Sequence, residues 1–130
     1  MKLATGRVKN RNDLNQYAQV TLSAESAAST VKRFEWLVDP QQTVVVNPDG
    51  SPLQHSRAWQ AACESGVYYA LRKAQLHTEG WHIVIHKIEG RISATDTSAF
   101  AIAASAALGN IIGKEIPYVD AKWEIVNGEQ

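Results

Sequence analysis

The sequence of 130 residues lacks the features that mark secreted and membrane proteins. Its single cysteine, Cys63, cannot form an internal disulfide, and no apolar signal segment with a cleavage site follows the start. Both observations favour a reducing, cytoplasmic setting. The longest apolar stretch runs from Ala99 to Ile112, which is shorter than the roughly 20 residues that a membrane helix requires. The sequence therefore predicts no membrane contact.

An excess of charge of one sign is also lacking. Thirteen Lys and Arg residues balance 13 Asp and Glu residues, so the chain as a whole does not attract nucleic acid or anionic lipid. Any partner of that kind must be bound by a local patch. From Lys2 to Arg11 the chain carries only basic charges, at Lys2, Arg7, Lys9 and Arg11. This segment is either a phosphate contact or a solvated edge strand protected by charge, and these residues alone favour the strand.

The motifs of common enzymes and nucleotide-binding proteins are missing as well. The sequence has no GxxxxGK[ST] loop, no HExxH, no GxSxG and no CxxC. We therefore expect no enzyme, no catalytic residues, no cofactor, no metal and no nucleotide-binding site on this chain. The length fits a single domain over residues 1–130.

What the sequence does contain is a small, apolar helix at Ala94–Gly113. Its core-facing residues recur at steps of three and four: Phe100, Ala103, Ala104, Ala107, Leu108, Ile111 and Ile112. Asp96 or Thr95 is expected to cap its amino end, and Gly113 followed by Pro117 is expected to end it. Because its other faces carry mostly alanine, this helix can lie close to its neighbours.

The remaining elements follow from apolar periodicity. Ser56–Ala74 has helical steps, and Gly66 inside it predicts a close approach to the sheet or to the second helix. Alternating residues predict strands at 16–24, 34–38, 81–86 and 119–125, whereas Val44–Val46 is too short to assign. The chain after Val126 is expected to be loose. This order predicts an α+β two-layer sandwich with both helices on one face of the sheet.

Two clusters of polar residues are candidate sites. His82 and His86 stand about 13 Å apart on an extended strand, which is too far for two ligands of one zinc ion. Ser93, Thr95 and Asp96, with Thr97 and Ser98, precede the apolar helix and form either a cap or an anion site. Whether Asp96 meets either histidine, or Asp39 meets His55, stays open at this point.

Three blocks resemble domain IV of translation elongation factor G. NQYAQV at Asn15–Val20 is similar to the strand that opens that domain, and ESGVYYAL at Glu64–Leu71 is similar to its first helix. TSAFAIAASAAL at Thr97–Leu108 is similar to its second helix, and the blocks keep their order across nearly the whole chain. The same domain of the tetracycline-resistance ribosomal protection proteins is similar over these segments.

The resemblance implies a four-stranded sheet backed by two helices, with a left-handed β-α-β crossover as in a small-subunit ribosomal protein and the protein part of ribonuclease P. It also implies a tip that meets the decoding centre of the ribosome, formed here by Lys9–Asn15 and Arg91–Asp96. The tip loops differ from the family, since KNRNDLN at Lys9–Asn15 has no glycine and Arg91–Ala94 has no histidine. No GTPase domain is present. The RNA-contact candidates are Lys9, Arg11, Arg91, Ser93, Thr95 and Asp96.

Three functional hypotheses follow. The first is a stand-alone domain IV-like protein that contacts ribosomal or other structured RNA through its tip loops, without GTPase activity of its own. The second is a protein-interaction or oligomerisation module that has lost the RNA-binding tip, which the zero net charge and the missing glycines favour. The third, a small enzyme that uses the cluster at Ser93–Ser98, has only the anion-site argument behind it.

Overall fold

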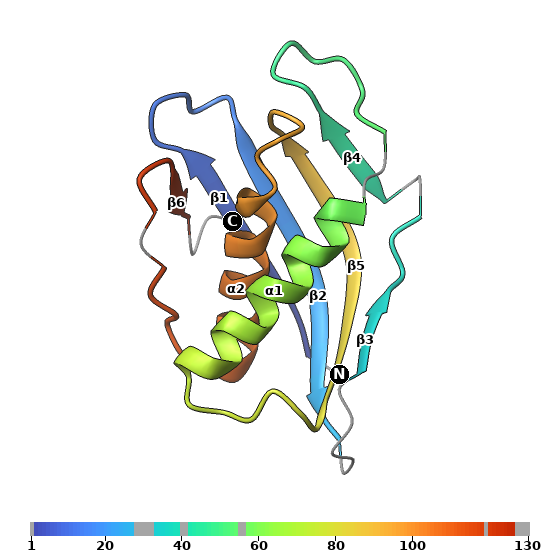
Figure 1. Ribbon diagram of the computed structural model, residues 1–130, viewed down its shortest axis with the longest axis vertical. Coiled ribbons are helices and arrows are strands. Elements are labelled where there is room, and N and C mark those ends of the chain that lie inside the picture. Colours follow the sequence, from blue (N-terminus) through green and yellow to red (C-terminus); the bar gives the residue numbers. More distant parts are fainter. Residues whose placement is uncertain (1, 28–32, 40–41, 55–56, 119, 127–130) are drawn as a thin grey trace.

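The computed structural model describes residues 2–27, 33–39, 42–54, 57–118 and 120–126, and these form six strands and two helices (Figure 1). The elements in chain order are β1 Lys2–Asn10, β2 Tyr17–Ser26, β3 Arg33–Trp36, β4 Thr43–Val46, α1 Arg57–Lys73, β5 Trp81–Arg91, α2 Ser98–Ile112 and β6 Trp123–Ile125. A strand at the amino-terminal basic segment, the strand left unassigned at Val44–Val46 and both helices are thus present. β1 is not the expected edge strand, however, because β2 lies on one side of it and β6 pairs with Val8–Asn10 on the other. The structure is an α+β sandwich with a mixed, open sheet.

The sheet has the order β3-β5-β2-β1-β6, and β4 also pairs with β5. β1 is antiparallel to β2 and β6, and β2 is antiparallel to β5, whereas β3 and β4 both run parallel to β5. β3 lies beside His82–Ile85 and β4 lies beside Ile88–Arg91, so two short strands share one edge of β5. The four-stranded sheet implied by the resemblance therefore differs from the six strands found in the described part of the chain. One edge is divided between β3 and β4, and β6 adds a strand on the other side.

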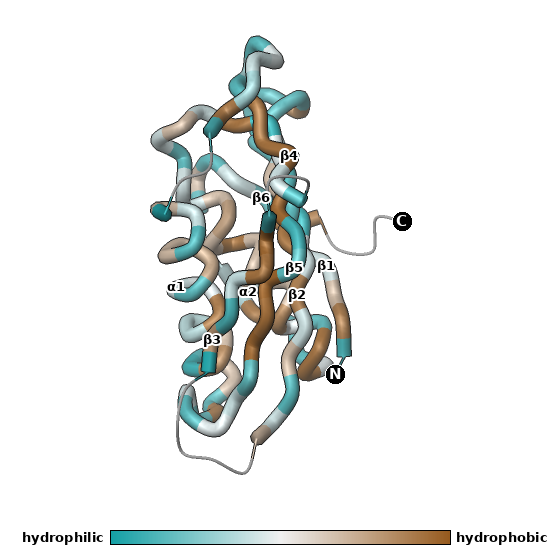
Figure 2. Tube along the Cα trace, turned by 90° about the vertical axis from the view of Figure 1, so that its right-hand side faces the viewer, coloured by the Kyte–Doolittle hydropathy of each residue, from teal (hydrophilic) through white to brown (hydrophobic). Residues whose placement is uncertain are grey.

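Both helices lie on the same face of the sheet, as the sequence predicted (Figures 1 and 2). α2 packs over β1 and β2, and α1 packs along α2. Gly66 of α1 permits this contact, because a Cβ at its position would lie 2.0 Å from the backbone oxygen of Ala101 in α2. Gly6 of β1 does the same beneath α2, since a Cβ there would lie 1.9 Å from the backbone oxygen of Ala103. The predicted close approach at Gly66 is confirmed, and its partner is the second helix.

The core fills the space between the helices and the sheet. The rings of Trp59 in α1 and Phe100 in α2 lie 5.7 Å apart, and both side chains are fully buried. Cys63 lies in the same core, and burial raises the pKa of its thiol. In the described part of the chain, no helix is long and apolar enough to cross a bilayer.

The structure corrects two predicted boundaries. Thr97, not Asp96 or Thr95, is the N-cap of α2, and its side chain makes no capping hydrogen bond. Gly113 ends this helix as predicted, with a φ of 72° and its backbone N–H donating to the carbonyl of Gly109. The last strand begins at Trp123 instead of at residue 119, which lies outside the described residues, as does the tail from residue 127.

Candidate nucleic-acid interface

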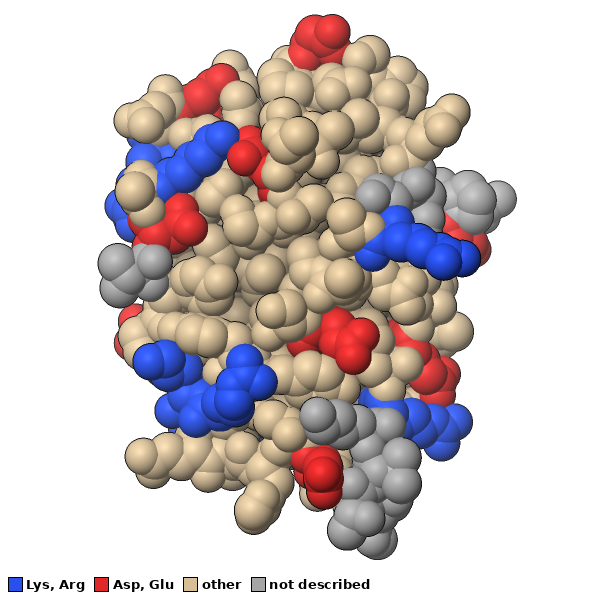
Figure 3. Space-filling view, viewed as in Figure 1, with Lys and Arg blue, Asp and Glu red and all other residues tan. Residues whose placement is uncertain are grey.

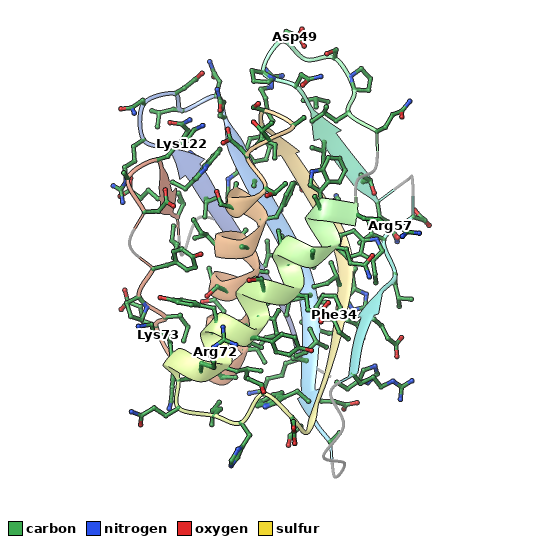
Figure 4. The ribbon with its side chains drawn as sticks, viewed as in Figure 1. Phe34, Asp49, Arg57, Arg72, Lys73 and Lys122 are labelled. Atoms are coloured by element: carbon green, nitrogen blue, oxygen red, sulfur yellow. The ribbon has the colours of Figure 1, made fainter. Side chains whose placement is uncertain are left out.

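Three loops meet at one end of the molecule, which we call the loop end (Figure 1). They join β1 to β2 over residues 11–16, β4 to α1 over residues 47–54, and β5 to α2 over residues 92–97. The first and third are the loops that the resemblance assigns to a tip. The second adds an acidic residue, because Asp49 lies at its outer turn (Figure 4). Hydrogen bonds from the hydroxyl and backbone N–H of Ser51 lower the pKa of Asp49, so its carboxylate stays charged.

Arg11 and Asp96 are both bound to the segment that leads into β6. The guanidinium of Arg11 donates to the carbonyl of Asp120 at 3.3 Å and lies 3.7 Å from the carboxylate of Glu124. The carboxylate of Asp96 accepts from Nζ of Lys122 at 2.7 Å. Asp96 therefore ties the start of α2 to this segment, and its charge repels phosphate instead of binding it. Each of these two candidates has an oppositely charged partner.

Ser93 and Thr95 form a local turn. Their hydroxyl oxygens lie 3.3 Å apart, and the carbonyl of Ser93 accepts from the backbone N–H of Asp96 at 3.0 Å. One hollow of about 420 Å³ lies beside Gly109 and Lys114, another of about 740 Å³ lies beside Leu76 and Trp81, and residues 93–98 line neither of these two. Ser93 is half-buried and Thr95 is exposed, so their hydroxyls can contact a partner that binds at the protein surface.

Lys9 and Arg91 lie in one row across the sheet. Lys9 in β1 is paired with Tyr17 in β2, and Tyr17 is paired with Arg91 in β5. Directly paired residues project to the same face of a sheet. In β1 the alternate residues Val8 and Asn10 are buried beneath the helices, so Lys9 projects from the opposite, open face. The register thus brings together two candidates that are 82 positions apart in the sequence.

The next row on the open face is a hydrogen-bonded ladder. Arg7 donates to Oε1 of Gln19 at 2.8 Å, and Gln19 donates to Oε1 of Glu89 at 3.0 Å. The hydroxyl of Tyr17 donates to the other oxygen of Glu89 at 3.3 Å, and Lys87 lies 3.7 Å from this carboxylate. The guanidinium of Arg7 lies 4.3 Å from the centre of the Tyr17 ring. Partial burial, followed by the charge of Glu89, raises the pKa of Tyr17.

Ion pairing distinguishes the cations of the loop end from Arg7, Lys9 and Arg91 on the open face. At the loop end, Arg11 and Lys122 have carboxylate partners. On the open face, Arg7, Lys9 and Arg91 have no carboxylate oxygen within 4.0 Å among the described residues. The helix side of the molecule carries Lys and Arg in separate small groups with Asp and Glu between them (Figure 3). The sequence did not single out Tyr17, Lys87 or Glu89, although their alternation along β2 and β5 is the signal that places them with Lys9 and Arg91.

The histidines have other partners than those considered from the sequence. His82 bonds to Glu35 at 2.7 Å through Nε2 and lies 3.7 Å from Glu25 through Nδ1. His86 bonds to the hydroxyl of Ser23 at 2.7 Å. Neither is bonded to Asp96, whose partner is Lys122, and His55 lies outside the described residues. In the part of the chain that the structure describes, no three His, Cys, Asp or Glu side chains are grouped so that they could hold a metal ion.

The fold and the geometry define an α+β sandwich with one face covered by helices and an open face that is partly basic near the loop end. No model of a known protein family matches this chain, and no curated protein matches it.

Proposed function

We propose that this chain is a stand-alone domain similar to domain IV of elongation factor G that contacts ribosomal or other structured RNA with its loop end, without GTPase or other enzymatic activity of its own. The observation that carries the proposal is the row formed by Lys9, Tyr17 and Arg91 at the edge of the loop end. Both cations come from segments that the resemblance assigns to the tip, and neither has a carboxylate partner among the described residues.

The path of the chain around β4, α1 and β5 supports the kinship. In Figure 1, β4 lies to the right of β5, both strands point toward the loop end, and α1 lies in front of the sheet. A chain that runs up β4, down through α1 and up β5 to its left makes a left-handed turn. About 98% of such crossovers are right-handed, so this sense is uncommon, and it is the one that the resemblance implies.

The contacts we propose are with phosphates and with the shape of the RNA. Lys9 and Arg91 supply unpaired positive charge, and the hydroxyls of Ser93 and Thr95 supply hydrogen bonds beside them. Arg11 contributes by exchanging the carboxylate of Glu124 for a phosphate. Asp96 acts indirectly, since it holds Lys122 and the start of α2 in place. We expect little base specificity from this set.

Filter binding of a folded ribosomal RNA fragment across a salt series tests the proposal. Arg11→Glu with Arg91→Glu should weaken binding at low salt at least tenfold, because two attractive charges become repulsive. The matched control is Arg72→Glu with Lys73→Glu, at the opposite end of the molecule on α1 (Figure 4). Equal losses in both double variants, or no binding of the unchanged protein at low salt, would exclude the proposal.

A protein-interaction module is the second candidate, and an exposed apolar side chain favours it. Leu14 in the first tip loop is 72% exposed, and Arg11 in the same loop already has its charge paired with Glu124. Such a loop suits a protein partner or a second copy of this chain better than RNA. Gel filtration and a pulldown that survives nuclease treatment would support this candidate, and both should be sensitive to Leu14→Ser.

A further inference from the structure

Cations extend beyond the loops along the open face of the sheet, and of these only Lys87 has a carboxylate partner among the described residues. We call Arg7, Lys9, Lys87 and Arg91, which surround Tyr17, the open-face patch. Arg7 and Lys87 lie one and two rows further from the loops than Lys9 and Arg91. The basic segment Lys2–Arg11 already contained Arg7 and Lys9, whereas nothing in the sequence marked Lys87 as part of a site. With neighbouring strands about 4.8 Å apart and about 3.4 Å per residue, the patch measures about 10 by 13 Å.

The patch has an excess of positive charge. Four cations face two carboxylates, those of Glu89 in the patch and Glu124, which is paired with Lys9 across β1 and β6. Four minus two leaves an excess of two positive charges. Glu124 is turned toward Arg11, and Glu89 already accepts from Tyr17 and Gln19 and lies near Lys87. The charges of Arg7, Lys9 and Arg91 are therefore available to an anion.

The patch is open to a ligand. Both helices lie on the other side of the sheet, so no described element covers this face (Figure 2). The side chain of Lys87 is 46% exposed, and the hydroxyls of Thr5 and Thr21 lie 3.0 Å apart beside it. An anion that reaches Arg7 displaces only a neutral amide, that of Gln19, so no ion pair has to be broken.

From this arrangement we propose that the open-face patch binds the phosphate backbone of a single RNA strand, which enters the sheet from the loop end. The inference rests on the proposed function for the nature of the ligand. An area of this size accommodates a few phosphates of one strand, whereas double-stranded RNA-binding domains span about 16 base pairs. The guanidinium of Arg7, 4.3 Å from the centre of the Tyr17 ring, offers a plane on which a base can stack. An acidic peptide would not use such a plane, so RNA is the occupant that the patch fits better.

Fluorescence anisotropy with a labelled oligouridylate of 12 nucleotides tests the inference between 50 and 200 mM salt. The patch variant combines Arg7→Gln, Lys9→Gln and Arg91→Gln. The matched control removes three positive charges from the helix side, with Arg57→Gln, Arg72→Gln and Lys73→Gln. We expect the patch variant to bind at least tenfold more weakly at 50 mM salt. Its slope of log affinity against log salt should fall by about 2, since each single-strand phosphate contact contributes about 0.7. The control should stay within twofold of the unchanged protein.

A second pair of substitutions separates this inference from the proposed function. Arg7→Gln with Lys87→Gln removes charge outside the tip loops, so it should weaken oligouridylate binding at least threefold and leave binding of the folded RNA fragment within twofold. Thermal unfolding followed by circular dichroism checks that each variant keeps the fold. Oligouridylate binding that is unaffected by either set overturns the inference, as does tighter binding of a polyglutamate peptide by the unchanged protein. If the unchanged protein does not bind the folded RNA but binds oligouridylate and both sets of substitutions weaken that binding, the proposed function is wrong and the inference is supported.

Discussion

The two faces of the sheet differ in how their side chains are held. On the helix face, the backbone of α2 lies so close to Gly66 of α1 and to Gly6 of β1 that neither position has room for a Cβ. On the open face, the partners are side chains of the same sheet, such as Arg7, Gln19 and Glu89, joined by hydrogen bonds in contact with solvent. Packing on the helix face excludes water, whereas the hydrogen-bonding groups on the open face can bond to water instead of to one another.

This difference separates stability from recognition. Burial of apolar surface contributes about 25 cal/mol per Å², so the helix face supplies most of the free energy that keeps the chain folded. An exposed hydrogen bond or ion pair contributes about 1 kcal/mol or less, because water replaces either partner. Substitutions on the open face can therefore change binding while the protein stays folded. Substitutions of buried residues on the helix face are expected to lower the free energy of unfolding instead.

The largest expected effect is at the contact between the two helices. Phe100→Ala removes a fully buried ring that lies 5.7 Å from that of Trp59, and it should lower the free energy of unfolding by about 3–5 kcal/mol. Urea denaturation followed by tryptophan fluorescence measures the loss. A cost below about 1 kcal/mol would show that this contact is loosely packed and would remove the contrast between the faces.

A smaller loss is expected at the crossing point of the helices. Gly66→Ala places a Cβ 2.0 Å from the backbone oxygen of Ala101, so α1 must move away from α2, at a cost of about 2–3 kcal/mol. Helix propensity alone would make this substitution favourable by about 1 kcal/mol. Ser65→Ala, at the adjacent exposed position of α1, is the control and should change stability by less than about 0.5 kcal/mol. An increase in stability at Gly66 would contradict the close approach of the helices.

Periodicity in the sequence predicted the helix face well. The apolar positions of α2 and the unusual glycine in α1 are local signals, and both point to helices packed closely on one layer. The capping of α2 was predicted wrongly because Asp96 is bonded to Lys122, 26 positions away, and that interaction outweighs the local preference for a cap. The division of one sheet edge between β3 and β4 also had no local signal, since each strand has only four residues.

The candidate site was predictable only in part. Lys9 and Arg91 were chosen by resemblance, and only the register of β1, β2 and β5 places them in one row with Tyr17. The partners of Arg11 and Asp96 come from residues 120–124. The alternation of residues in that segment predicts a final strand but does not indicate these ion pairs. Strand register and ion pairs between distant segments decide which charged side chains remain available to a ligand. Neither can be derived from one sequence alone.

On the open face, a smaller loss of stability is expected when one hydrogen bond among Arg7, Gln19, Tyr17 and Glu89 is removed. Tyr17→Phe removes the hydrogen bond to Glu89 and keeps the ring beneath Arg7, so unfolding should become easier by about 0.5–1 kcal/mol. Thermal unfolding measures the change. A loss as large as that of Phe100→Ala would mean that the open face also stabilises the fold, and the separation of roles proposed above would be wrong.

The smallest effect concerns the far end of the open face and depends on pH. The hydrogen bond from His82, followed by the nearby charge of Arg33, lowers the pKa of Glu35 below its ordinary value of 4.5. A carboxyl group whose pKa is lower in the folded state stabilises the fold above its unfolded pKa, and this contribution disappears as the pH falls through the folded value. The difference in melting temperature between the unchanged protein and Glu35→Gln should therefore be constant from pH 5.5 to about 5 and shrink toward zero as the pH falls from about 4.5 to 3.

Glu79→Gln, which removes an exposed carboxylate without an ion pair among the described residues, controls for the loss of one charge. A Glu35 difference that grows as the pH falls would have the wrong sign for a carboxylate held by His82, and the absence of any difference beyond that of Glu79→Gln would show that solvent screens this contact completely.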